Sequence, residues 1–315
     1  MTTKTRLFTP TNPDLVRPLS KRELQILYQV GYGKYMSADL IAARLRYSYL
    51  NEPVVKIRQI NGREVQSQQT GQAIERAASK LFHQGGYLQR NPTQVVLRGL
   101  ETGSHKMIYE LPPKGRRALN QIKQGATSAF AKPRSTHVPQ MLHTLMINHL
   151  RVALTVECEQ NPHLELLRCT MLPKDLRWKV TYYPPNKREA VSKDHVPDML
   201  IGFQYGKWRI HFFNEATRSN KEPQRFLDKI RRYEAYDATK GHQKQHDIKS
   251  FGVLTTTQDK ETRGKLRALV TNSPIKHRLY FASITDIDPW HHESVLKPIW
   301  VTGSSPEPKS LLPQA

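Results

Sequence analysis

The stretch that decides the fold is VPDMLIGFQYGKWRIHFFNEATRSNKEPQRFLDKIRRYEAY, residues 196–236. The apolar run after Pro197 predicts a strand, Gly206-Lys207 predicts a turn, and residues 208–213 predict a second strand. The next segment has helical periodicity, with an apolar face formed by Phe226, Ile230 and Tyr233. A hairpin followed directly by an amphipathic helix indicates a mixed α and β domain.

The same block extends on both sides of this stretch. An amphipathic helix is expected over 141–159, strands over 251–257 and 278–284, and a helix over 261–270. The fold class that follows is α+β or α/β for this part of the chain.

Two carboxylates mark the ends of the hairpin. Asp198 opens its first strand, and Glu215 follows the second. Side chains at these positions can converge on one cation, and hard oxygen ligands suit Mg²⁺. A metal held by Asp198 and Glu215 would polarise a phosphate and activate water, which makes both residues candidate catalytic and metal-binding residues.

This pattern resembles the PD-(D/E)XK nuclease superfamily, which has a restriction-endonuclease-like fold. Pro197-Asp198 matches its first element and Glu215 its second. The superfamily has a lysine two residues after the glutamate, where this chain has Thr217. The resemblance therefore leaves Lys229 and Arg218 as the cations that would steady the phosphate.

Each of these residues also has a structural interpretation. Asp198 can cap a turn, and Glu215 can pair with Arg218. Glu157, in the preceding helix, is either a third metal ligand or an exposed helical acid. Tyr233 is either a packing residue or the nucleophile of a relaxase. A nuclease fold retained only for binding is an alternative of equal standing.

The N-terminal block reads as three helices and two strands. Ser20 with Glu23 forms a capping box for the first helix, the second begins at Ser37, and the third covers 72–84. Strands are expected near Tyr87-Leu88 and at 107–111. Three helices followed by a two-stranded wing predict a winged helix-turn-helix domain, whose third helix enters the major groove.

Polar and basic residues of this block are the candidate DNA contacts. A protein-docking module is the alternative, but the density of cations expected at the surface favours DNA. The candidate residues are Gln72, Arg76, Lys80, Arg90, Arg98, Lys106, Arg116 and Arg117.

The expected domains are a flexible arm over 1–18, the winged helix over 19–124, a linker over 125–139, the nuclease-like domain over 140–302 and a disordered tail over 303–315. Within 46–71, an Asn61-Gly62 turn predicts a hairpin. That hairpin is either a second DNA-contacting ribbon or a solvent-facing insertion.

The charge of the chain points to a polyanionic partner. The 315 residues include 49 Lys+Arg and 27 Asp+Glu, a net charge of +22. Residues 1–135 contain 22 basic and 8 acidic side chains, a net of +14, so this part is the expected place for double-stranded DNA to bind. Two cysteines exclude a disulfide framework, and the sequence contains no membrane-spanning stretch. We therefore expect a cytoplasmic protein.

Other chemistries lack their motifs. The chain has no P-loop, no dinucleotide-binding glycine fingerprint and no serine nucleophile elbow. His291-His292 lacks the paired spacing of a zinc site. An RNA-binding role has no evident aromatic stacking platform.

The whole arrangement resembles the bacterial replication-relaxation family. The resemblance rests on a winged helix, a linker, Pro197-Asp198, then Glu215-x-x-Arg218, and a helix with Lys229-x-x-x-Tyr233. It covers about residues 20–300, and Thr217 and Ser219-Asn220 depart from its second motif. It implies a role in plasmid replication or mobilisation, with replication or conjugation proteins as partners. Two hypotheses follow: a DNA-binding protein with Mg²⁺-dependent nicking, or a non-catalytic replication or transcription regulator.

Overall fold

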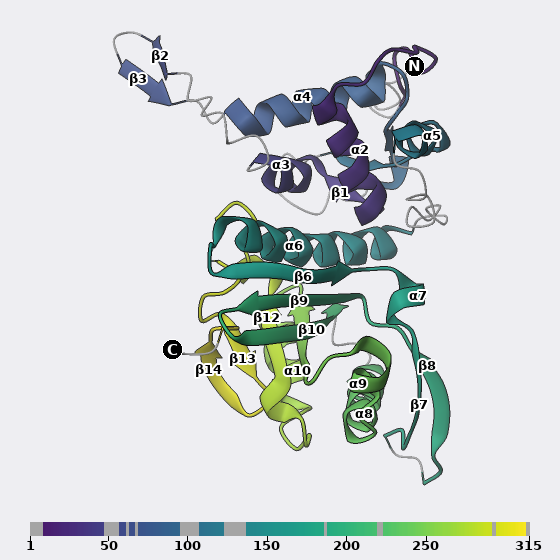
Figure 1. Cartoon of the computed structure of the whole chain (residues 1–315), viewed down its shortest axis with the longest axis vertical. Coiled ribbons are helices and arrows are strands. Elements are labelled where there is room, and N and C mark those ends of the chain that lie inside the picture. Colours follow the sequence, from purple (N-terminus) through teal and green to yellow (C-terminus); the bar gives the residue numbers. More distant parts are fainter. Residues whose placement is uncertain are drawn as a thin grey trace. The chain divides into compact units, whose positions relative to one another are not determined.

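A computed structural model describes residues 9–46, 57–60, 63–66, 69–94, 107–122, 137–185, 188–218, 223–291 and 294–312 (Figure 1). The chain divides into two compact units, Met1–Asn148 and His149–Ala315. In the residues so described, no helix has the length and apolar character needed to cross a membrane.

The first unit contains the three expected helices, α2 (Lys21–Gly33), α3 (Ala38–Arg46) and α4 (Gln69–His83), and a further helix, α5 (Pro113–Ile122). The capping box of α2 is present, since Ser20 Oγ accepts from the backbone N–H of Glu23 and Glu23 accepts from the backbone N–H of Ser20. Apolar side chains of the three helices meet in a buried core that includes Ile26, Leu27, Ile41, Ile74 and Phe82.

A small antiparallel sheet completes this unit. Its order is β1-β5-β4, formed by Met36–Ser37, Ile108–Glu110 and Gln89–Arg90. The hairpin within 46–71 is confirmed as β2 (Ile57–Ile60) paired antiparallel with β3 (Arg63–Gln66), although its turn lies outside the described residues.

The arm expected to be flexible is docked over its described residues. The N–H of Asn12 donates to the carbonyl of His83, and the N–H of Gly85 donates to the carbonyl of Asn12. Lys114 Nζ donates to the carbonyl of Pro13. The expectation is therefore wrong for this part of the arm, because backbone groups that a free arm would give to water are bonded to the unit. The expected linker lies mostly outside the described residues, and α6 (Val138–Gln160) already begins within its last two positions.

The second unit is a mixed α and β structure around a seven-stranded sheet of order β14-β13-β12-β11-β10-β9-β6 (Figure 1). The strands are β6 (Leu164–Thr170), β9 (Met199–Tyr205), β10 (Trp208–Thr217), β11 (Gly252–Thr257), β12 (Leu279–Ser283), β13 (Trp300–Thr302) and β14 (Ser305–Lys309). β10, β11 and β12 run parallel, and the remaining neighbours are antiparallel.

The disordered tail predicted from residue 303 is wrong for Ser305–Lys309. This strand pairs with β13, with Thr302 opposite Ser305 and Trp300 opposite Lys309. Its two prolines suit an edge strand, which needs few backbone donors.

Helices and a separate ribbon surround the sheet. They are α7 (Pro173–Leu176), the antiparallel ribbon of β7 (Trp178–Tyr182) and β8 (Val191–His195), α8 (Pro223–Ala238), α9 (Gly241–His246) and α10 (Lys260–Ala268). Inward-facing Phe226, Ile230 and Tyr233 of α8 pack with Trp178 and Phe213 in one buried cluster, as the helical periodicity predicted.

Candidate functional site

The β9-β10 hairpin places the two predicted carboxylates beside each other. Met199 pairs with Asn214, so Asp198 and Glu215 occupy the next position of the ladder. The N–H of Asp198 donates to the Asn214 carbonyl at 3.0 Å, and Asp198 Oδ2 accepts from the N–H of Ala216 at 2.8 Å. This side-chain contact crosses to β10, so it is not the turn cap of the structural interpretation.

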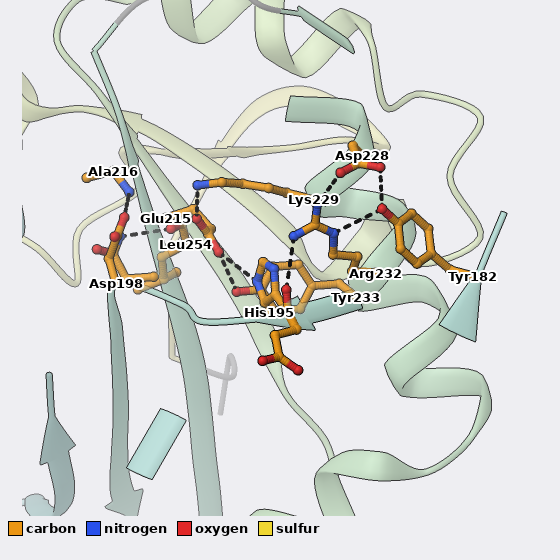
Figure 2. Close-up of polar contacts among 12 residues, drawn as sticks. Tyr182, His195, Asp198, Glu215, Ala216, Asp228, Lys229, Arg232, Tyr233 and Leu254 are labelled. Atoms are coloured by element: carbon orange, nitrogen blue, oxygen red, sulfur yellow. Dashed lines mark hydrogen bonds and ion pairs between the residues drawn. The ribbon is translucent and has the colours of Figure 1, made fainter. Parts of the chain in front are cut away.

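Glu215 is completely buried and is the centre of a polar cluster (Figure 2). Its Oε1 lies 3.0 Å from His195 Nε2 and accepts from Tyr233 OH at 2.8 Å. Its Oε2 accepts from Lys229 Nζ at 2.5 Å. Two elements thus converge on the carboxylate of β10: β8 provides the imidazole, and α8 provides the hydroxyl and the ammonium one turn apart. We call these four side chains the Glu215 cluster.

The electrostatics of the cluster favour a charged Glu215. Burial by itself raises its pKa, but the charge of Lys229 and the hydrogen bond from His195 outweigh burial and lower that pKa well below the usual carboxyl range. Burial lowers the pKa of Lys229, but the negative charges of Glu215 and Asp198 outweigh burial and raise that pKa above its usual value. The pair is therefore a carboxylate and an ammonium.

Tyr233 is a neutral donor in this cluster. Burial, followed by the charge of Glu215, raises the pKa of Tyr233 well above its usual value. Its ring packs against Trp178 and Phe213 at centroid distances of 5.6 and 5.8 Å. A fully buried hydroxyl that donates to a carboxylate matches the packing interpretation and argues against its use as a nucleophile.

A second polar cluster connects the β7-β8 ribbon to α8. Asp228 Oδ1 accepts from Tyr182 OH at 2.5 Å, and Arg232 donates to both Asp228 and the Tyr182 hydroxyl. Arg232 also reaches the backbone carbonyl of Asp194. These contacts hold the ribbon against α8, so that His195 at the end of β8 faces Glu215.

The remaining candidates of this unit are Arg218 and Glu157, together with Thr217 at the motif lysine position. Thr217 ends β10 opposite Thr257, and Arg218 follows it. Glu157 is buried in α6, where it accepts from Asn161 Nδ2 at 3.2 Å. The prediction that Glu157 is an exposed helical acid is therefore wrong. Among the described residues, no group of His, Cys, Asp and Glu side chains that could hold a metal ion includes it.

The donor set around Glu215 does not fit Mg²⁺ as it stands. Both carboxylate oxygens accept hydrogen bonds, and the ammonium of Lys229 occupies the position beside Oε2 where a cation would bind. Within the described ranges, no three His, Cys, Asp or Glu side chains group together as a metal site would require. The magnesium site at Asp198 and Glu215 stays a prediction, and no chemical step is derived from it.

The predicted DNA contacts of the first unit fall into four groups, of which the buried Arg90 is described separately below. Arg76, Lys80 and Arg117 are exposed, the first two on α4 and the third on α5. Arg116 is half-buried and donates to the Leu111 carbonyl at 2.9 Å. The Gln72 side chain, Arg98 and Lys106 lie outside the described residues.

The prediction that Arg90 is a surface residue is wrong. It is buried, its guanidinium lies 4.2 Å from the centre of the Phe82 ring, and it donates to Tyr109 OH at 3.0 Å and to Ser79 Oγ at 3.2 Å. Stacking on an aromatic face together with these hydrogen bonds compensates the buried charge. Arg90 is part of the core of this unit.

Sequence reasoning missed His195, Tyr182, Asp228 and Arg232. The alternation of buried and exposed residues in WKVTY was a usable signal for the ribbon, because Trp178, Val180 and Tyr182 all face inward. The spacing of Asp228 and Arg232 was a second signal, since i, i+4 pairs share a helix face.

Comparison with known proteins finds one family. The family model described as "Replication-relaxation" matches residues 52–254, more than half of the chain and including Asp198, Glu215 and Lys229. Neither a curated protein nor a solved structure matches the chain.

Proposed function

The chain belongs to the replication-relaxation family, and from this membership we propose that it is a DNA-binding protein of a bacterial mobile element, acting in plasmid replication or mobilisation. The observation that carries the proposal is the exposed basic side of α4, with Arg76 and Lys80 one turn apart in the more positively charged part of a +22 chain. Such a surface binds phosphate with release of counterions.

The first unit is proposed to bind duplex DNA as a winged helix. The order helix, strand, helix, β2-β3 hairpin, helix, strand, strand supports this proposal, because it leaves α4 as the third helix before the hairpin of β4 and β5. In this geometry α4 enters the major groove, and Arg76 and Lys80 contact bases or phosphates.

The second unit is proposed to bind rather than cleave. Every hydrogen-bonding contact of Glu215 described above uses a donor of the protein itself, and Asp198 holds the backbone of Ala216. This saturation favours the non-catalytic regulator over the nickase.

Metal-dependent nicking is the alternative. The observation that favours it is the meeting of Asp198, Glu215 and Lys229, the three residue types of the nuclease motif, at one end of the hairpin. It requires Lys229 to move aside for the ion. In that case Arg218 would be the other cation available after β10.

Supercoiled plasmid carrying the native flanking DNA of the gene tests both hypotheses. The purified full-length protein is incubated with it in Mg²⁺, in Mn²⁺ and in EDTA, and the products are separated on a gel. We expect retarded but uncut plasmid in all three conditions.

Conversion to open circles in Mg²⁺ or Mn²⁺ alone would overturn the binding-only proposal. Asp198→Ala is the control, because a genuine nickase loses its cleavage and retains its retardation in this variant. Failure to retard the plasmid in every condition, at low salt, would contradict the DNA-binding proposal itself.

A further inference from the structure

The β9-β10 hairpin turns at the end opposite the Glu215 cluster, and this exposed tip carries aromatic and basic residues. The sequence there is Tyr205-Gly206-Lys207-Trp208-Arg209. Tyr205 pairs with Trp208 across the turn, and Gly206 has a φ of +54°, which glycine adopts without strain. Gln204 Nε2 donates to the carbonyl of Gly206 at 3.1 Å. The turn therefore has a side-chain hydrogen bond of its own, and Lys207 and Trp208 are exposed at its end.

Trp208 is unusual in its exposure. Its exposed fraction is 52%, whereas Trp178 and Trp300 are buried at 2% and 0%. Lys207 Nζ lies 5.3 Å from the centre of the Trp208 ring. A large indole left in water at the tip of a hairpin is available for a flat aromatic partner.

Lys207 lies beside this indole, and Arg209 follows it on the opposite face of β10. Lys207 and Arg209 are exposed, and neither takes part in an ion pair of the described residues. Arg168 on β6 pairs with Gly202 of β9, and Gly202 in turn pairs with His211 of β10. Burial first, and then the charges of Arg168 and Arg209, lower the pKa of His211, and strand alternation places these three residues on the face opposite Trp208. Glu165, opposite Gln204, is the acidic residue of these rows.

The tip is separate from the Glu215 cluster. Trp208 and Glu215 are seven residues apart on one strand, about 23 Å at 3.3 Å per residue. Because the separation is odd and β9 and β10 pair without a register shift, the two side chains lie on opposite faces of the sheet. A ligand of the tip does not need the Glu215 cluster.

We propose that the tip binds single-stranded DNA, with a base stacked on Trp208 and a flanking phosphate on Lys207. This inference rests on the proposed function, since it names the form of DNA that the second unit binds. In a duplex both faces of each base are covered by its neighbours, so an exposed indole finds a free face only on an unpaired base. The adjacent Lys207 supplies the attraction to the backbone.

The test measures binding of the full-length protein to labelled dT20, to a 20-base-pair duplex and to U20 RNA. Trp208→Ala is expected to weaken dT20 binding by about 5- to 150-fold, the range of one lost stacked base, and to leave duplex binding within about twofold. Trp208→Phe retains a ring and is expected to recover most of the affinity. Tyr183→Ala removes another exposed aromatic residue, 64% exposed on the β7-β8 ribbon end, and should change neither affinity.

Tryptophan emission gives a direct second reading. The chain has four tryptophans, and we expect dT20 to quench emission in the wild type but not in Trp208→Phe. Unchanged dT20 affinity in Trp208→Ala, with equal quenching in Trp208→Phe, would overturn the inference while duplex binding still supported the proposed function. Stronger binding of U20 than of dT20 would assign the tip to RNA. Loss of all DNA binding in the wild type would instead contradict the proposed function.

Discussion

Lys229 and Glu215 form a charged pair whose two members have unequal exposure. The Glu215 side chain is 1% exposed and the Lys229 side chain 27%. Removing the cation leaves an unpaired buried carboxylate, which is destabilising, whereas removing both charges leaves no buried charge. Removing one charge of the pair is therefore expected to destabilise the protein more than replacing both residues with uncharged ones.

Lys229→Met is expected to lower the free energy of unfolding by about 3 kcal/mol, because it leaves Glu215 without its cation. Glu215→Gln combined with Lys229→Met should recover at least half of that loss. Guanidinium titrations of the wild type, of Lys229→Met, of Glu215→Gln and of the double variant check the prediction. A double variant as unstable as the sum of its single changes would show that the pair does not interact in the way described.

At the scale of the element, α2 depends on an ion pair at its first turn. Arg17 donates to both oxygens of Glu23, which also completes the capping box with Ser20. The hydrogen bond from Arg17 is the main cause that lowers the pKa of Glu23 to about 2. Since this pKa is lowered on folding, the stabilisation is complete above the ordinary value of 4.5 and is lost as the pH falls towards 2.

Glu23→Gln is expected to cost about 1–2 kcal/mol of unfolding free energy at pH 7 and close to nothing near pH 2. Urea titrations at several pH values measure the difference between wild type and variant. Glu261→Gln is the control, because Glu261 is 76% exposed in its pair with Lys265 and should change stability little at any pH. A constant difference across the pH range would contradict the assigned ion pair.

At the scale of the whole molecule, charge is the property that links sequence to partner. Residues 1–135 have a net charge of +14, and the remaining 180 residues, with 27 basic and 19 acidic side chains, have a net of +8. Binding through several phosphate contacts should therefore weaken steeply as salt rises.

Arg76→Ala is expected to reduce the slope of log affinity against log salt for duplex DNA by about one unit. Fluorescence anisotropy between about 50 and 200 mM salt measures this slope. Lys249→Ala, an exposed lysine of the second unit, should leave the slope unchanged if the first unit binds the duplex. Equal slopes for wild type and Arg76→Ala would show that α4 makes no phosphate contact through this residue.

Local periodicity determined most of the elements. The 3.6-residue spacing predicted α2, α4, α8 and α10, and the alternating and apolar runs predicted β9, β10 and β11 within a few residues. The position of Asp198 beside Glu215 also followed from the sequence, because a two-residue turn sets the pairing register of its hairpin.

Tertiary structure alone decided what each polar side chain contacts. His195 reaches Glu215 only because the β7-β8 ribbon packs on α8, and Arg90 is buried only because Phe82 and Tyr109 meet beside it. Residues 305–309 form a strand only because β13 offers them an edge. Periodicity reports the face of one element at a time, whereas burial and charge pairing depend on which elements meet. That is set by the packing of the whole unit.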